Sequence, residues 1–462
     1  FPLNQSGKVD RAALGEIEQN RALRHSSLRT NVRRNRLSDS ICSAWRGVAQ
    51  PAEHLLDFDG MKHQRFCDLG GTSLLAAQVS AQLLESTGTA VPVVFLLGNP
   101  SASELLDLLE SNDIDHVSSK RPRSTAPQAA GAQAVVEKCT GTVVWSVAMH
   151  ACVDASPVIN HSSNTAYVGS HSGDFVAVSL QDGAVLWRTR LPDRVESSAC
   201  FDSDHVFVGC YDRCLYALHV LTGAVHWKCP TGDVVKSSTR IVGKHVWFGS
   251  HDGIIRACCA SSGDVVFKSS AAAAEKPSPV FSSPAVLGEA AIFFASLSGC
   301  LTKIDVPART VCWRKTLPDA IFSSPVITDA GLLLVGCCDG SLYCCRGSTG
   351  DIVWSFPTEG AVFSSPRLSP CGSTVFVGSH SKFVFAIDAI TGNLQWKYKM
   401  SAEVYATPGL FFGMSRRLHV AFVAINGDAL VFDVAGQEGT IAFSGTVDGH
   451  VFSSPALLST NG

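Results

Sequence analysis

The chain has 462 residues, of which 46% are hydrophobic, and its formal net charge is −3. Such a length allows several hydrophobic cores, and the nearly balanced charge does not favour nucleic acid as a partner. No apolar run is long enough to cross a bilayer, so the composition predicts a soluble, multidomain protein without a membrane partner.

The first residues place a lysine in a Ser-Gly turn. They read Phe-Pro-Leu-Asn-Gln-Ser-Gly-Lys-Val-Asp-Arg-Ala-Ala-Leu, a run that resembles the closing motif of adenylate-forming enzymes. The resemblance implies that residues 1–20 are the tail of an adenylation domain. It also implies that Lys8 is catalytic and reaches the substrate carboxylate and the ATP phosphate, where a flexible ammonium can follow the developing charge. An ordinary surface lysine is the alternative.

A chain that begins inside this motif lacks most of an adenylation domain. We therefore expect the chain to be the C-terminal portion of a longer protein. ATP and magnesium would bind in the missing part, and this adenylation domain would be the first partner of the remaining chain. The chain alone would not activate an acid.

Residues 21–37 are rich in arginine and predict a solvated basic linker. An RNA-binding arm is the alternative, but no aromatic side chains alternate with the arginines to stack on bases. The arginines are Arg21, Arg24, Arg29, Arg33, Arg34 and Arg36.

A glycine turn places one serine at a predicted helix start. The run Asp68-Leu69-Gly70-Gly71-Thr72-Ser73-Leu74 precedes apolar residues at helical spacing. A phosphodiester on Ser73 would face free backbone N–H groups and the positive end of the helix dipole. Gly70 and Gly71 leave room for a modifying enzyme. A plain helix cap is the alternative.

Helical patterns flank this serine on both sides. Residues 39–45 are amphipathic, and Ser101 and Glu104, directly after Pro100, form a predicted capping box. With these flanks the segment resembles carrier domains of the acyl, peptidyl and aminoacyl kind.

This resemblance implies a small all-α, four-helix carrier domain over residues 38–112. It implies that a phosphopantetheinyl transferase attaches 4′-phosphopantetheine covalently to Ser73. The other predicted residues of the attachment site are Asp68, Gly70 and Gly71. Residues 113–138 are rich in Ser, Pro, Ala and Gly and predict a flexible linker, which suits a carrier that visits more than one partner.

From residue 139 the sequence repeats with a period of about 40 residues. Short apolar runs separated by Asp-Gly, Ser-Gly or Thr-Gly turns predict hairpins stacked into four-stranded sheets. Such repeats predict an all-β propeller. Ser-Pro pairs keep the same step as an aromatic marker, which recurs at Trp145, Trp187, Trp227, Phe267, Trp313, Trp354 and Trp396.

Residues 139–462 thus predict a propeller of seven or eight blades. Seven repeats are readable, the last of them degenerate around Phe432 and Phe443, and an eighth begins at Phe452. Residues 140–145 read as the end of a unit and residues 452–462 as the beginning of one. We expect these two segments to share one incomplete blade and to close the ring.

The unit Leu-Tyr-Ala-Leu, followed by Thr-Gly and Trp, resembles the propeller repeats of pyrroloquinoline-quinone (PQQ) dehydrogenases. In those enzymes a calcium ion, an aromatic floor and often a disulfide between adjacent cysteines surround the quinone. No set of calcium ligands can be assembled here, so the residues do not favour bound PQQ. The adjacent cysteines fall at ordinary repeat positions: Cys258-Cys259, Cys337-Cys338 and Cys344-Cys345.

The chain has seventeen cysteines with no spacing typical of a disulfide scaffold. Many lie in apolar runs and pack as small hydrophobic residues, which favours a reducing compartment and a cytoplasmic location. No Cys or His cluster has zinc spacing, so no metal site is predicted from the sequence.

The order of adenylation tail, carrier and quinone-type propeller resembles a family of ATP-dependent amino-acid-activating ligases. The resemblance implies that β-alanine is loaded as a thioester on the arm of Ser73 and passed to an unknown acceptor through an amide bond. Aminoadipate is an alternative substrate. The propeller is expected to bind the acceptor or a partner protein on its top face. A PQQ-dependent oxidoreductase and a non-catalytic interaction scaffold are the alternative functions.

Overall fold

The fold is taken from a computed structural model of the chain. It describes residues 37–44, 79, 82–83, 86–87, 91, 96, 101–111, 144–272, 278–413, 417–434, 439–447 and 450–456. The chain divides into two compact units, Phe1–Pro127 and Gln128–Gly462. Among the residues described, no helix combines the length and the apolar character needed to cross a membrane.

The described part of the first unit is mainly helical. Residues 37–44 form a helix that buries Ile41, and α5 (Ala102–Ser111) buries Leu105 and Leu109. The predicted amphipathic stretch before Ser73 is therefore helical where it is described. The four-helix architecture stays a prediction, because most of residues 45–100 lie outside the described residues.

The predicted capping box begins α5. The backbone N–H of Ser101 donates to Oε2 of Glu104 at 2.7 Å, and the N–H of Glu104 donates to Oγ of Ser101 at 3.2 Å. These reciprocal bonds satisfy backbone donors that the first helical turn leaves free. This local prediction is confirmed.

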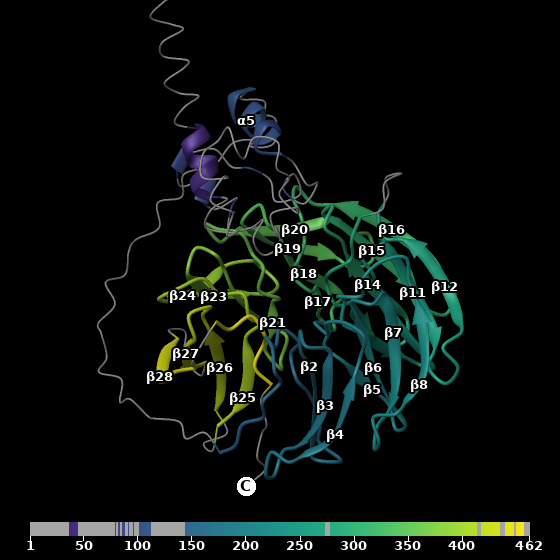
Figure 1. The fold of residues 1–462 in the computed structure, drawn as a ribbon. Helices are drawn as coiled ribbons and strands as arrows, with labels where there is room; N and C mark the ends of the chain where they lie inside the picture. Colours follow the sequence, from purple (N-terminus) through teal and green to yellow (C-terminus); the bar gives the residue numbers. More distant parts are fainter. Residues whose placement is uncertain are drawn as a thin grey trace, which may run out of the picture. The chain divides into compact units, whose positions relative to one another are not determined.

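The described residues of the second unit form seven four-stranded antiparallel sheets, each in chain order, and Figure 1 shows them following one another around the propeller. Blade 1 is β1 (Val158–Asn160), β2 (Thr165–Gly169), β3 (Asp174–Ser179) and β4 (Val185–Arg190). Blade 2 is β5 (Cys200–Phe201), β6 (His205–Cys210), β7 (Cys214–His219) and β8 (Val225–Pro230). Blade 3 is β9 (Arg240–Val242), β10 (His245–Gly249), β11 (Ile254–Cys259) and β12 (Val265–Ser270).

The remaining four blades follow the same plan. Blade 4 is β13 (Ala285–Leu287), β14 (Ala291–Ala295), β15 (Cys300–Asp305) and β16 (Thr310–Thr316). Blade 5 is β17 (Val326–Ile327), β18 (Leu332–Gly336), β19 (Ser341–Arg346) and β20 (Ile352–Pro357). Blade 6 is β21 (Arg367–Leu368), β22 (Thr374–Gly378), β23 (Phe383–Asp388) and β24 (Leu394–Lys399). Blade 7 is β25 (Gly409–Phe412), β26 (Leu418–Val423), β27 (Asp428–Asp433) and β28 (Thr440–Thr446).

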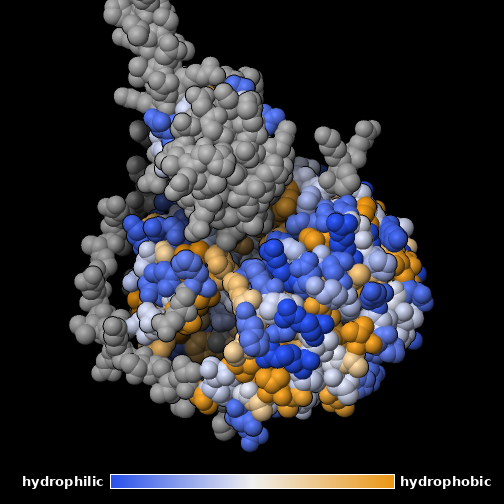
Figure 2. All heavy atoms as spheres, viewed as in Figure 1, coloured by the Kyte–Doolittle hydropathy of each residue, from blue (hydrophilic) through white to orange (hydrophobic). Residues whose placement is uncertain are grey.

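Burial changes across each blade. In blade 2 the central strands β6 and β7 are almost entirely buried, whereas the outer strand β8 is mostly exposed. Central strands covered on both faces by neighbouring blades read as continuous apolar runs, as the sequence pattern indicated. The outer strands mix exposed apolar and polar side chains, and hydrophilic and hydrophobic residues are interspersed over the face seen in Figure 2.

The repeat register predicted from the aromatic markers is confirmed. Trp187 pairs with Ala177 in blade 1 and Trp227 with Ala217 in blade 2. In every blade a β-bulge next to this pair shifts the register between the third and fourth strands, and the extra residue lies in the fourth strand. Phe443 takes the same place in blade 7, which is a regular four-stranded sheet rather than a degenerate one.

The tryptophan markers dock each blade onto the next. Nε1 of Trp187 donates to the carbonyl oxygen of Val220 at 3.0 Å, and its ring lies against Gly223. A Cβ at Gly223 would come within 2.5 Å of the ring, and the φ of +67° at this turn also favours glycine. The Thr-Gly turn and the tryptophan are thus two halves of one interface between blades.

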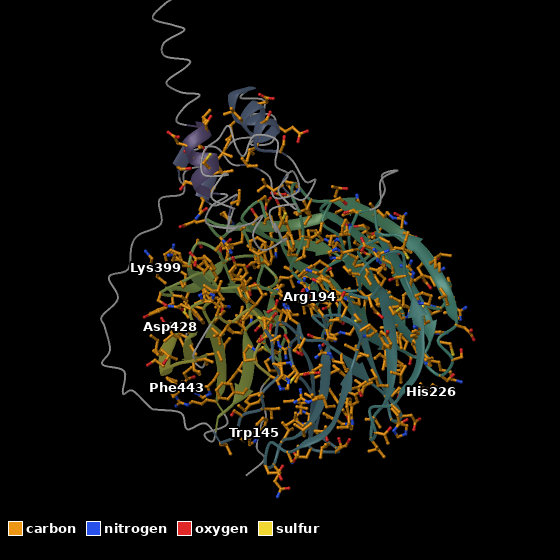
Figure 3. All side chains as sticks on the ribbon, viewed as in Figure 1. Trp145, Arg194, His226, Lys399, Asp428 and Phe443 are labelled. Carbon is orange, nitrogen blue, oxygen red and sulfur yellow. The ribbon has the colours of Figure 1, made fainter. Side chains whose placement is uncertain are left out.

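Two further segments complete the ring. Nε1 of Trp145 donates to the carbonyl oxygen of Leu180, as the tryptophan of a preceding blade would, and Trp145 is labelled at the edge of the propeller in Figure 3. On the inner side, the N–H of Ser454 donates to Oγ of Ser156 at 3.0 Å. Residues 144–150 and 450–456 therefore take the outer and inner places of an eighth blade, although neither is assigned as a strand.

Candidate functional site

Eight hydroxyl side chains surround the propeller axis, one just before each blade and one in the closing segment. Six hydrogen bonds of 2.8–3.1 Å run from the backbone N–H of one member to the Oγ of the next. The bond from Ser454 to Ser156 joins residues 298 positions apart and closes this ring. The eight are Ser156, Ser198, Ser238, Ser283, Ser324, Ser365, Thr407 and Ser454.

The residue two positions before each hydroxyl changes character around the axis. Three consecutive positions are charged and the next five are aromatic. We call these groups the charged arc and the aromatic arc, and together the axial ring. The charged arc is Asp154, Glu196 and Lys236, and the aromatic arc is Phe281, Phe322, Phe363, Tyr405 and Phe452.

Neighbouring rings of the aromatic arc are in contact. Their centroids are 5.3–5.7 Å apart, with tilted or edge-on geometry. This spacing is the one that aromatic pairs prefer, because the edge of one ring is attracted to the face of the next. Phe322 is 7% exposed and the other four rings are half-buried. The arc thus forms an apolar wall that remains accessible.

The charged arc is held by ion pairs. Nζ of Lys236 lies 3.2 Å from Oε2 of Glu196, and both side chains are only 13% exposed. Nε2 of His171 lies 3.0 Å from Oδ2 of Asp154 and 3.2 Å from Oε1 of Glu196. Sγ of Cys152 lies 3.1 Å from Oδ1 of Asp154. Partial burial and the Asp154 carboxylate raise the pKa of the Cys152 thiol to about 11.

Cations over aromatic rings join the two arcs. Nζ of Lys236 lies 5.1 Å from the ring centre of Tyr211 and 5.3 Å from that of Phe281. The guanidinium of Arg194, labelled near the middle of the propeller in Figure 3, lies 5.3 Å from the ring centre of Tyr211. All three distances are within the range of cation–π attraction. Burial and the Glu196 carboxylate raise the pKa of Tyr211, which keeps its hydroxyl protonated.

Two histidines stand beside the axial ring. His380 lies 4.8 Å from Phe363 and 4.5 Å from Tyr405 by ring centres, and His251 lies 6.5 Å from Phe281. Burial lowers the pKa of each to about 4, with the Lys236 ammonium adding to the effect at His251. Nε2 of each has no hydrogen-bond partner among the described residues. Both imidazoles are neutral at pH 7 and can bond to a ligand.

This arrangement suits an amphipathic ligand. An aromatic wall binds a flat or apolar group, and paired charges at the other side of the ring orient a polar end. In the sequence, the charged and aromatic residues of the ring stand two positions before each of the eight hydroxyl residues. This signal becomes readable only when the repeats are aligned and the eight positions are placed around one axis.

The residues predicted for the carrier chemistry lie outside the described residues. They are Lys8, Asp68, Gly70, Gly71 and Ser73. The adjacent cysteine pairs are described, and each of their thiols is free. Cys258, Cys344 and Cys345 are buried in third strands, and Cys338 lies in a turn, as expected for ordinary repeat positions.

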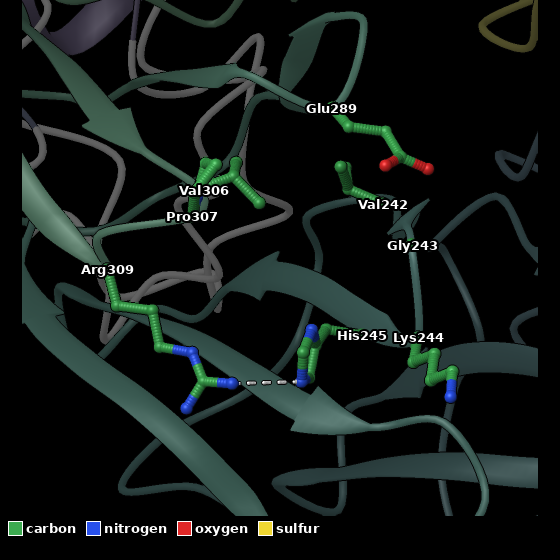
Figure 4. Close-up of a pocket in the computed structure, with 8 residues that line it drawn as sticks. All are labelled: Val242, Gly243, Lys244, His245, Glu289, Val306, Pro307 and Arg309. Atoms are coloured by element: carbon green, nitrogen blue, oxygen red, sulfur yellow. Dashed lines mark hydrogen bonds between the residues drawn. The ribbon is translucent and has the colours of Figure 1, made fainter.

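A pocket lies between blades 3 and 4. This pocket has a volume of about 260 Å³ and is shown in Figure 4, where Arg309 bonds to Nε2 of His245 at 3.3 Å. Blade 3 has Phe267 at the tryptophan position, and Arg309 stands at the turn where other blades have the docking glycine. The pocket is thus located at a blade interface where both docking residues differ from Trp187 and Gly223.

Fold and sequence together define a class: a phosphopantetheine carrier domain followed by a quinoprotein-type propeller. Residues 40–109 match the profile described as "Phosphopantetheine attachment site". Residues 149–461 match the profile described as "Beta-alanine-activating enzyme, beta-propeller". The second match covers well over half of the chain, and the chain belongs to this family. It therefore contains the carrier domain and the propeller of a beta-alanine-activating enzyme.

Curated relatives agree with this assignment. The chain is 35% identical over 90 residues to the beta-alanine-activating enzyme of Homo sapiens, an alignment that covers 20% of this chain and 8% of that protein. It is 44% identical over 62 residues to that of Mus musculus, covering 12% and 6%. Bacitracin synthase 3 of Bacillus licheniformis is 32% identical over 111 residues, covering 24% and 2%. The alignments span a tenth or less of these relatives.

Solved structures share the propeller fold. BamB from Moraxella catarrhalis superposes with a TM-score of 0.54 at 17% identity, covering 61% of this chain and 86% of that chain. Quinohemoprotein alcohol dehydrogenase from Comamonas testosteroni gives 0.56 at 12% identity, covering 68% and 69%. At these identities the likeness shows the fold alone.

Proposed function

We propose that the chain is the carrier and propeller portion of an ATP-dependent ligase that loads β-alanine as a thioester on phosphopantetheine at Ser73. The observation that carries this proposal is the order of the two profile matches along the chain, a phosphopantetheine attachment domain followed by the propeller of a beta-alanine-activating enzyme. Bacitracin synthase 3 matches by sequence as well.

Each predicted residue has a chemical role in this proposal. Ser73 supplies the hydroxyl that is esterified, next to a glycine turn formed by Gly70 and Gly71. The arm's thiol attacks the aminoacyl adenylate, which forms the thioester and releases AMP. Lys8 assists formation of that adenylate by placing an ammonium beside the reacting carboxylate and phosphate. The thioester keeps the acyl carbon reactive towards an amine.

The axial ring is proposed to bind the acceptor or a partner protein. Its half-buried aromatic wall and the paired charges of Glu196 and Lys236 support this role, because together they recognise an apolar group with a polar end. Phe363→Leu should slow transfer of the β-alanyl group from the loaded arm to a mixture of primary amines and leave loading unchanged. Equal transfer rates for Phe363→Leu and the parent chain would show that the axial ring does not take part in this step.

Intact-mass spectrometry tests the carrier role. The full chain is incubated with coenzyme A and a broad-specificity phosphopantetheinyl transferase, and Ser73→Ala is the matched variant. We expect one added pantetheine arm on the parent chain and none on the variant, with Ser80→Ala, a serine further along the same predicted helix, modified like the parent. Modification of Ser73→Ala, or no modification of a folded parent chain, would contradict the proposal.

A further inference from the structure

The charged side of the axial ring gathers one thiol, one imidazole and two carboxylates. One ligand atom from each of Cys152, Asp154 and His171 lies within 4.8 Å of the others. Oε1 of Glu196 approaches the same imidazole nitrogen at 3.2 Å. We propose that these four side chains form a binding site for a divalent zinc ion.

The donor set fits zinc. Zn²⁺ accepts thiolate, imidazole and carboxylate ligands in tetrahedral geometry, with bonds of about 2.0–2.3 Å. In that geometry the ligand atoms are about 3.3–3.7 Å apart. The three ligand atoms of Cys152, Asp154 and His171 lie within 4.8 Å of one another, and Oε1 of Glu196 lies 3.2 Å from Nε2 of His171. Small side-chain movements would therefore bring all four groups around one ion. Zinc would take the place of the contacts that Nε2 of His171 makes with the two carboxylates.

The fold holds these ligands at one place. His171 lies in the turn between β2 and β3, and its backbone N–H donates to the carbonyl oxygen of Cys152 at 2.9 Å. Asp154 and Glu196 occupy neighbouring positions of the axial ring. The side chain of Cys152 is exposed, so an ion can enter from solvent.

The charges around the site also balance. A thiolate and two carboxylates supply three negative charges, which a divalent ion and the Lys236 ammonium neutralise together. Nζ of Lys236 contacts Oε2 of Glu196 at 3.2 Å and leaves Oε1 facing His171. An outer partner of this kind orients a ligating carboxylate and fixes its geometry. The site thus has both its ligands and a group that positions one of them.

The first experiment measures zinc binding by the full chain after treatment with a chelator. Titration against a zinc indicator should show one tight site, and Cys152→Ser and His171→Asn should each raise its Kd by at least about 100-fold, since even the loss of an outer partner costs about 10–100-fold. Cys371→Ser is the matched control. Cys371 is another exposed thiol in a different blade, and it is not part of the cluster of possible metal ligands found among the described residues. It should bind zinc like the parent.

Two further readouts separate binding from folding. Zinc should protect Cys152, but not Cys371, of the parent chain from alkylation, as mapped by peptide mass. Cobalt in place of zinc should give a thiolate-to-metal charge-transfer absorption that Cys152→Ser lacks. Zinc retained after both ligand substitutions, or no zinc bound by the parent chain, would mean that these contacts are hydrogen bonds only and would overturn the proposal.

Discussion

The two arcs of the axial ring occupy equivalent backbone positions but are stabilised in different ways. The charged arc depends on specific ion pairs, such as Lys236 with Glu196, which are costly to leave half made. The aromatic arc depends on ring contacts that tolerate small shifts, and each of its three inner rings touches a ring on both sides. A propeller repeats its backbone closely, so its specificity is found at the positions where the repeats diverge.

Acid should have the largest effect, because two neutral, buried histidines stand beside the axial ring. Burial lowers the pKa of His251 and His380 from the ordinary value near 6.5 to about 4. Between these values the unfolded chain binds protons that the folded chain does not, so stability falls as pH falls from 6.5 to 4. The loss should be about 2 kcal/mol for each histidine.

Urea unfolding at pH 6.5 and pH 4.5 measures this loss. His251→Gln and His380→Gln should each make the free energy of unfolding less dependent on pH, and the double variant should show both effects. His161→Gln, at an exposed histidine, is the control and should leave the pH dependence as it is. A double variant with the parent's pH dependence would refute the assignment.

Phe322→Ala should have the next largest effect. Phe322 is 7% exposed and lies between Phe281 and Phe363, so its removal leaves a cavity in the aromatic arc. We expect the free energy of unfolding to fall by about 3 kcal/mol, the usual range for a buried phenylalanine. Thermal and urea unfolding give the measurement, and Phe322→Leu should recover more than half of the loss. A loss below about 1 kcal/mol would show that the arc is only a surface feature.

Lys236→Met should have a smaller effect on stability, through the charged arc. It leaves the half-buried Glu196 carboxylate without its ammonium partner, which should cost about 2 kcal/mol once residual solvent exposure is considered. Lys397→Met is the matched control, since its ion pair with Glu359 is exposed and should contribute less than about 1 kcal/mol. If urea unfolding shows the same loss of unfolding free energy for both variants, the buried ion pair is no more stabilising than the exposed one.

Much of the fold is readable because each repeat shows its own hairpin pattern. The Gly turns, the apolar strand runs and the markers Trp187 and Trp227 predicted the four-stranded blades and their register, and Ser101 with Glu104 predicted the start of α5. Ser73 and Lys8 remain predictions from motifs. The axial ring was missed, since its members are 40 or more residues apart and no local pattern relates an Asp at one position to a Phe at the next.

The sequence by itself determined the blades, their order and the family, because hydrophobic periodicity and turn residues act over a few neighbours. Only the tertiary structure decided that the predicted ring closure includes the hydrogen bond from Ser454 to Ser156, and that Cys152, Asp154 and His171 meet at one place with Glu196 beside the imidazole. The physical reason is that closing a propeller converts large separations along the chain into contacts around an axis. No short-range rule contains that information.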